Sequence, residues 1–197
     1  MWIQYLVIFQ WVAIIVLAVF MLGIARQIGV LHRRIGPAGA LMTSSKAKVG
    51  DPSPIFNLKT IDGMPLSIGG AAQDGKSTLI AFVAPDCPVC KSLIPIYKAI
   101  ASEESGRMNL VFASDGFDEA RQQAYRDAHA LQNFPYVLSM ELGMAFEIAK
   151  LPYAVLIGPD GKVAGQGLVN TREHIESLLE AQRMRVSSIQ DYLEKRA

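Results

Sequence analysis

The chain begins with an apolar run that carries no charged side chain from Trp2 to Ala25. At a rise of about 1.5 Å per residue, a helix of twenty-odd apolar residues crosses a hydrocarbon layer of roughly 30 Å. Aromatic residues gather toward the start of the run, where amphipathic rings favour a membrane interface. We therefore predict a transmembrane helix over residues 2–24, and any soluble fold has to be sought in the residues that follow.

A cleaved signal peptide is the alternative for this run. Such a peptide has a basic start, a shorter apolar stretch and a nearby cleavage site with small residues. Here no basic residue precedes the run, and the Ala-x-Ala triplet at residues 38–40 lies beyond the first three arginines. The pattern favours an anchor that is not removed.

Charge divides the chain at the same place. Residues 1–50 carry five Lys or Arg and no acid, whereas the rest carries 14 Lys or Arg and 18 Asp or Glu. The basic residues after the span are suited to contact lipid headgroups, and the mildly acidic remainder excludes a basic face for nucleic acid. We expect an anchor over residues 1–25, a linker rich in Gly, Ala and Ser over 26–48, and one folded domain over 49–197.

Apolar runs and turn signals alternate along that domain. A buried strand is predicted over 77–84 because the run is short, continuous and β-branched. A helix interrupted by Pro95 follows over 91–104. The remaining pattern predicts strands over 108–114 and 136–140, helices capped by Asp118 and near Asn170, a short helix over 141–149, and two strands joined by a Pro-Asp-Gly turn over 153–169. This alternation indicates an α/β domain with a central sheet covered by helices on both faces.

Two cysteines, Cys87 and Cys90, lie between the first buried strand and the helix after it. A zinc site would need about four ligands. The chain offers one C-x-x-C pair and three isolated histidines (His32, His129 and His174), so we expect no metal site. A purely structural disulfide across three residues closes too short a loop to stabilise a fold much.

A redox pair is the reading that fits this position. Cys87 would begin the helix, where unpaired N–H groups and the helix dipole stabilise a thiolate. Cys90, one turn further, would be shielded and could resolve a mixed disulfide. Pro88 and Val89 would shape the turn, and Lys91 adds a positive charge. The cysteine pair would be the redox group, with no other cofactor.

About 60 residues further on, Pro152 comes just before another apolar run. It could simply start a strand. In a redox fold of this kind, however, a cis-proline at such a place faces the disulfide. The backbone of its neighbour, Leu151, is then free to pair with a substrate strand, so we predict that both residues bind substrate.

Three segments of the chain resemble the thioredoxin superfamily. They are "VGDPSPIFNLKTIDGMPLSIG", "LIAFVAPDCPVCK" and "LPYAVLIGPDGKV". They are similar to the membrane-tethered branch of peroxiredoxin-like and thiol-reductase-like proteins, and they cover about residues 49–185. The resemblance implies a thioredoxin-like fold, with a central mixed sheet flanked by helices, after one N-terminal transmembrane helix.

The segment "ARQIGVLHRRIGPAGALM" directly after the span, together with the CPVCK site, resembles a membrane-anchored family of methylamine utilisation proteins. That resemblance implies an accessory factor for the maturation of methylamine dehydrogenase. Its implied client is the small, disulfide-rich β-subunit, which carries a tryptophan-derived quinone. The partner that re-oxidises or reduces the cysteine pair is not implied.

The chain departs from the thioredoxin pattern at three positions. Asp86 stands where Trp is common, and an acid beside Cys87 opposes its ionisation. Ala81 replaces a buried acid, and Leu93 replaces a Glu of the cytochrome-maturation reductases. These changes favour a client-specific oxidase or isomerase over a general thiol reductase. They also leave open a membrane-tethered chaperone or docking module without redox activity. A peroxidase is disfavoured, because no Thr-x-x-Cys site is present.

Two signals conflict over the orientation of the anchor. Basic residues after the span favour a cytoplasmic location for residues 26–48. A disulfide-handling domain and a periplasmic client favour the opposite side. We expect a single-pass protein of the inner membrane with its soluble domain in the periplasm.

Overall fold

The computed structural model describes residues 2–34 and 47–184, and the chain divides into two compact units, Met1–Thr43 and Ser44–Ala197. The first unit contains one helix, α1 (Trp2–Arg34). Within it, Gln4–Leu22 has a mean hydropathy of 2.6 and is the one stretch of the described chain long and apolar enough to cross a membrane. The helix continues to Arg34, into the segment expected to be a linker.

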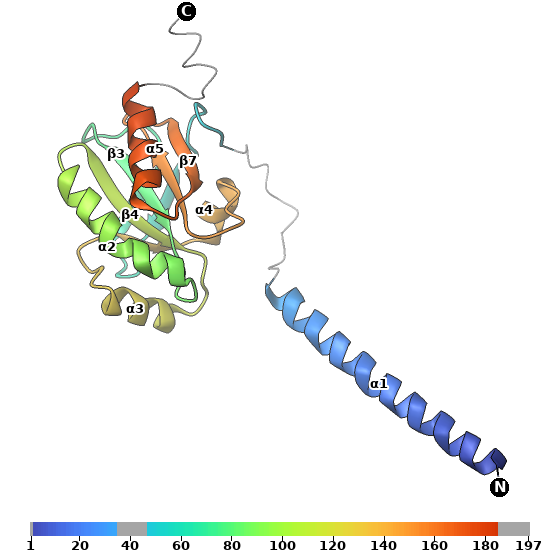
Figure 1. Ribbon diagram of the computed structural model, residues 1–197. Coiled ribbons are helices and arrows are strands. Elements are labelled where there is room, and N and C mark those ends of the chain that lie inside the picture. The colour runs from blue at the N-terminus through green and yellow to red at the C-terminus, as the bar shows by residue number, and fades with distance from the viewer. Residues whose placement is uncertain (1, 35–46, 185–197) are drawn as a thin grey trace, which may run out of the picture. The chain divides into compact units, whose positions relative to one another are not determined.

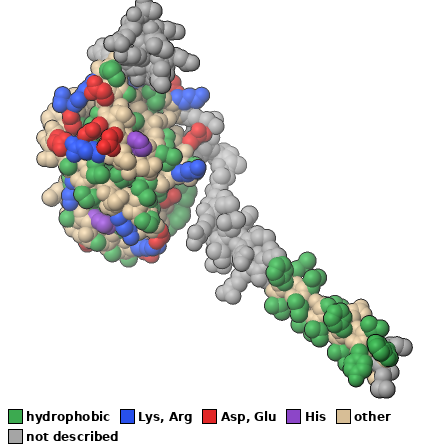
Figure 2. Space-filling model, viewed as in Figure 1, with side chains coloured by type: hydrophobic (Ala, Val, Ile, Leu, Met, Phe, Trp, Pro, Cys, Tyr) green, Lys and Arg blue, Asp and Glu red, His purple; other side chains and the backbone are tan. Residues whose placement is uncertain are grey.

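The two units differ in the distribution of their side chains (Figure 2). Hydrophobic side chains follow one another along the described part of α1, with no charged side chain among them. Acidic and basic side chains are interspersed over the visible face of the second unit. A helix whose apolar side chains are all exposed is suited to a lipid environment, which is the environment that the sequence predicts for it.

A five-stranded mixed sheet forms the centre of the second unit, with the strand order β5-β4-β3-β6-β7 (Figure 1). β3 is parallel to β4, and β4 to β5, whereas β6 is antiparallel to both β3 and β7. The strands are β3 (Ser77–Phe82), β4 (Met108–Ser114), β5 (Tyr136–Leu138), β6 (Tyr153–Ile157) and β7 (Val163–Leu168). The sheet confirms the α/β architecture and the element order expected from the sequence.

Apolar side chains cover both faces of this sheet. Leu79 and Ala81 of β3 face a cluster that includes side chains of α2 (Pro88–Glu103), α3 (Glu119–Ala128) and α5 (Arg172–Met184). Their neighbours Ile80 and Phe82 face a second cluster. Side chains of α4 (Met140–Ala145) and of a hairpin that precedes β3 in the chain belong to this cluster. Because successive side chains of a strand point to opposite faces, a strand buried on both sides has to be apolar throughout.

The hairpin joins β1 (Phe56–Lys59) to β2 (Pro65–Ile68). Its turn contains Gly63 at φ +78°, a conformation that favours glycine. The Ile61 N–H donates to the Tyr136 carbonyl at 2.8 Å, so the hairpin is attached to β5.

Four helices differ from the sequence predictions at one end. α2 begins at Pro88 and runs through Pro95 without interruption, because its buried face packs into the core and outweighs the hydrogen bond that Pro95 cannot donate. α3 and α4 end at Ala128 and Ala145, before the expected residues. α5 begins at Arg172, so Asn170 lies ahead of the cap position, and its N–H donates to His174 Nδ1 at 3.2 Å. The expected end of that last helix lies outside the described residues.

Candidate redox site

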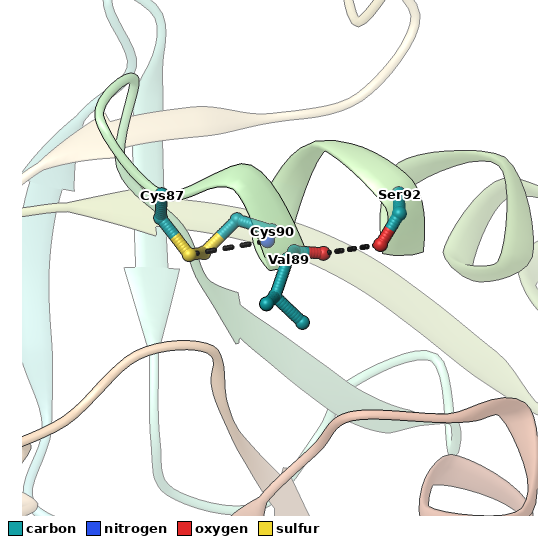
Figure 3. The surroundings of a disulfide bond; sticks show 4 residues. All are labelled: Cys87, Val89, Cys90 and Ser92. Carbon is teal, nitrogen blue, oxygen red and sulfur yellow. Dashed lines mark hydrogen bonds between the residues drawn. A yellow bond between two sulfur atoms is a disulfide. The ribbon is translucent and has the colours of Figure 1, made fainter.

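Cys87 and Cys90 form a disulfide in the turn between β3 and α2, with their Cα atoms 5.2 Å apart (Figure 3). Cys87 is half-buried, whereas Cys90 is completely buried beneath the first turn of the helix. A molecule that approaches from solvent can therefore reach one sulfur of the pair. The two cysteines have the unequal exposure that an attacking and a resolving thiol require.

Cys87 is the N-cap residue of α2, and Pro88 follows at the start of the helix. The backbone N–H of Cys90 donates to Cys87 Sγ at 3.1 Å (Figure 3). A hydrogen bond to the sulfur and the positive end of the helix dipole both favour a negative charge at this atom. Once the disulfide is reduced, Cys87 is the sulfur that the local structure stabilises as a thiolate.

The surroundings of Cys90 are apolar. Ala81 and Leu93, at the two positions where related folds carry an acid, are both buried in the same cluster as Cys90. None of the Asp and Glu residues that the structure describes is buried, and burial raises the pKa of Tyr97 in the same cluster above the ordinary value. Apolar surroundings disfavour a buried charge, so Cys90 is the less suited of the two sulfurs to carry a negative charge.

Pro152 lies at the same end of the sheet as the cysteine turn. The Leu151–Pro152 peptide bond is cis, as the sequence predicts, and Pro152 is buried. Tyr153, the next residue, pairs with Phe82 at the end of β3, and the disulfide turn begins a few residues after Phe82. Leu151 is half-buried and packs against both core clusters. Substrate binding by Leu151 and Pro152 stays a prediction.

The neighbours of the cysteines are exposed. Asp86, Pro88 and Lys91 are exposed, and Val89 exposes 42% of its surface. Asp86 forms an ion pair with Arg121 of α3. The sequence analysis missed Arg121, because the two residues lie 35 positions apart and nothing in the order of residues indicates that they meet.

The two histidines whose side chains the structure describes belong to no group of metal-binding side chains. His129 is half-buried with its ring 4.7 Å from that of Tyr125, and desolvation, followed by Lys91 and Lys98, lowers its pKa. His174 is exposed, and the side chain of His32 lies outside the described residues. In the described ranges, no three His, Cys, Asp or Glu side chains are grouped closely enough to hold a metal ion.

A pocket of about 800 Å³ opens at the opposite end of the sheet. Ser77 and Met108, at the starts of β3 and β4, line it together with residues of the β6–β7 turn and the end of α5. It contains none of the predicted site residues, so the site is judged from the chemistry of the cysteine turn.

The thioredoxin-like domain family matches residues 64–183, which is more than half of the chain. Comparison with solved structures gives the same fold. A thiol-disulfide oxidoreductase from Bacteroides fragilis superposes with a TM-score of 0.57 at 20% identity and covers 66% of this chain and 98% of its own. A thioredoxin-family thiol:disulfide interchange protein from Chlorobium tepidum gives 0.56 at 24% identity, with 69% and 97% covered. The fold and its C-x-x-C turn therefore define a thioredoxin-like protein.

Sequence relatives narrow this class. The methylamine utilization protein MauD of Paracoccus denitrificans is 45% identical over 186 residues, which cover 94% of this chain and 92% of that protein. MauD of Methylorubrum extorquens is 44% identical, with 94% and 89% covered. The chain belongs to the MauD family of methylamine utilization proteins, and the resemblance found in the sequence is confirmed.

Proposed function

We propose that this chain is a membrane-anchored thiol–disulfide oxidoreductase that assists disulfide formation in the small β-subunit of methylamine dehydrogenase. The observation that carries the redox assignment is the cysteine turn itself. It pairs a half-exposed sulfur, which is stabilised as a thiolate, with a fully buried one. The family relationship and its name support the link to methylamine utilization.

The surroundings of the two sulfurs support one direction of exchange, the donation of a disulfide to the client. In the oxidised protein, a client thiolate attacks Cys87 Sγ, the Cys87–Cys90 bond breaks, and Cys90 leaves as a thiolate that takes up a proton. A second client thiolate then attacks the client sulfur of the mixed disulfide and releases Cys87 as a stabilised thiolate. The client gains one disulfide, and the two electrons stay on the cysteine pair. A second partner that carries a disulfide accepts these electrons and restores the pair.

The opposite direction is less well supported by the site. The backbone hydrogen bond and the helix N-terminus at Cys87 favour its thiolate and therefore the reduced state of the pair. A pair whose reduced state is stabilised gives its disulfide away more readily than it reduces one. The site therefore favours donating a disulfide over reducing one.

A trapping experiment in cells tests this function. In Cys90→Ser, the Cys87 thiolate can attack a client disulfide, which is the reverse of the last donating step, and no Cys90 is present to displace the client. A mixed disulfide with the client β-subunit should therefore accumulate on non-reducing gels. Cys87→Ser, the matched control, should give no adduct and no correctly paired client. If the variant with both cysteines changed to serine still supports an active methylamine dehydrogenase, the redox role is wrong and a docking or chaperone role is left.

The same trapped adduct reports the side of the membrane. We place the soluble domain in the periplasm, with α1 as a single span of the inner membrane, because client disulfides form in an oxidising compartment. A membrane-impermeant phosphine added to cells with a permeabilised outer membrane should then reduce the adduct. An adduct that resists this reagent until the inner membrane is lysed would contradict the periplasmic orientation.

A further inference from the structure

Asp86 creates an electrostatic difficulty for the proposed nucleophile. Its carboxylate is exposed and belongs to the residue directly before Cys87. A negative charge close to a thiol disfavours the thiolate and raises the thiol pKa. The hydrogen bond and the helix dipole at Cys87 act in the opposite sense.

Arg121 meets this carboxylate from another element. Its Nη2 atom forms an ion pair with Asp86 Oδ1, with the two side chains 54% and 74% exposed. The strands that lead to the cysteine turn and to α3 end side by side, and the Val83 N–H, just before the cysteine turn, donates to the Ala113 carbonyl near the end of β4. The guanidinium therefore places a positive charge on the acid next to the nucleophile.

Buried hydrogen bonds hold the start of α3 where this pair can form. Gln122, the residue after Arg121, is 3% exposed. Its Nε2 donates to Ser114 Oγ at 2.9 Å, and its Oε1 accepts from the Tyr136 hydroxyl at 2.7 Å. Asp118 caps the helix by accepting from the Arg121 N–H at 3.0 Å. Arg121 therefore projects from a fixed first turn and not from a mobile loop.

We propose that Arg121 is a positioning residue that keeps the Cys87 thiol acidic by neutralising Asp86. This inference rests on the proposed exchange at Cys87. An exposed ion pair contributes little to stability, so the purpose of this one lies in the charge that the sulfur experiences. Removing the guanidinium leaves the acid uncompensated. For an exposed acid on the adjacent residue, we expect that charge to raise the thiol pKa by about half a unit, which leaves about threefold less thiolate at neutral pH.

Other charged groups also lie at this end of the sheet. They are Lys91 on α2, Asp115 and Asp118 ahead of α3, Glu119 in its first turn, and Glu147 and Lys150 ahead of β6. All of them are unchanged in the variants below. The difference between the variants therefore isolates the Asp86–Arg121 pair from the rest of the local field.

The test measures the pH dependence of iodoacetamide alkylation at Cys87. Full-length protein in detergent carries Cys90→Ser, so that Cys87 is the single thiol. In this background we compare Arg121→Gln, Asp86→Asn and the double variant. Arg107→Gln is the matched control. Like Arg121, Arg107 is an exposed arginine in an ion pair with an acidic side chain, here that of Glu104. It lies just before β4, at the end of the sheet far from the cysteines.

Arg121→Gln should raise the alkylation pKa by about half a unit, and the double variant should return it to the parent value or below. Arg107→Gln should leave it unchanged. The shift should shrink in 1 M salt, where the Debye length is about 3 Å. An unchanged pKa in Arg121→Gln would overturn the role of Arg121 and leave the proposed redox function standing. So would a rise in the double variant as large as the rise in Arg121→Gln. A Cys87 that is inert in every variant would overturn the proposed redox function as well.

Discussion

Within the cysteine turn, two sulfur atoms three residues apart lie in different surroundings. Cys87 accepts a backbone N–H and reaches solvent, whereas Cys90 is buried among apolar side chains. The fold achieves this difference by starting a helix at Cys87, because one turn of helix carries the fourth residue inward. The sequence was sufficient to predict where the pair lies and which sulfur is the more shielded, since both depend on local order. The attacking and resolving roles stay a prediction.

The charges around the pair could not be predicted in the same way. Asp86 was correctly identified as a departure from the thioredoxin pattern, but Arg121, which pairs with it, lies on a different helix. Buried Gln122 was also missed, because a glutamine in a polar helical stretch gives no sign that its amide will face a serine and a tyrosine. Contacts between side chains distant in sequence depend on how the elements pack, and periodicity does not report that.

Two buried tyrosines provide a matched pair of substitutions. The Tyr97 hydroxyl is buried with no hydrogen-bond partner among the described residues, whereas the Tyr136 hydroxyl donates to Gln122. Removing a buried hydroxyl that makes no hydrogen bond should not destabilise a protein. Removing one that makes a hydrogen bond leaves its buried partner without one, which lowers the free energy of unfolding. We expect Tyr97→Phe to leave stability unchanged or raise it by up to about 1 kcal/mol, and Tyr136→Phe to cost about 1–2 kcal/mol in urea unfolding. A larger loss in Tyr97→Phe would mean that the hydroxyl has a partner.

At the level of elements, the sequence predicted most of the sheet. Each central strand is a short apolar run, and β3 is apolar throughout because both of its faces are covered. Helix ends were predicted less well. Pro95 was expected to interrupt α2, yet the burial of Leu93, Ile94, Tyr97 and Ile100 holds a continuous helix around it. Local propensity is a weak guide where tertiary burial is extensive.

The hairpin is held against α3 by a buried cation. The Arg126 side chain is 7% exposed and pairs with Asp62, which lies in the hairpin turn and is 50% exposed. The other partner of Arg126, Asp127, lies at 3.4 Å. Loss of Asp62 therefore leaves a buried charge poorly compensated, whereas loss of Arg126 leaves an exposed acid, and the first should cost more. We expect Asp62→Asn to destabilise the protein by about 1–3 kcal/mol and Arg126→Met by about 1 kcal/mol or less.

Hydrogen exchange of the hairpin amides measures where this loss occurs. Both variants should speed exchange across residues 56–68, and the cysteine turn should keep its protection. If Arg126→Met proves the more damaging change, then the hydrogen bonds of the guanidinium, which Met cannot make, matter more to the hairpin than the cost of leaving a buried charge without Asp62.

For the molecule as a whole, buried tyrosines predict an alkaline limit to stability. Burial raises the pKa of Tyr125 to about 12, and burial raises the pKa of Tyr97 and Tyr136 further. A phenol with a raised pKa in the folded state contributes stability that is present below pH 10 and is lost as pH rises toward the folded value. We expect the thermal midpoint of the oxidised protein to fall by about 5–10 °C between pH 9 and pH 11.

The thermal midpoint is measured by circular dichroism of the full chain in detergent. Tyrosinate absorbance is followed in parallel. The oxidised form is used because disulfide-bonded cysteines do not titrate. Tyr125→Phe should make the fall smaller. A midpoint that is flat across this interval would show that the phenols ionise in the folded state.

The place where the chain enters the folded domain has a mechanical consequence. The Gly50 N–H donates to the Val163 carbonyl, the Val163 N–H donates to the Asp51 carbonyl, and the Ser53 N–H donates to Gly161, all beside the β6–β7 turn. The cysteine turn follows the opposite end of β3, so about six residues of central strand separate the two places. Tension or torque arriving along the chain from the bilayer would load the β7 edge first, and the reactive turn would be insulated from movements of its own tether.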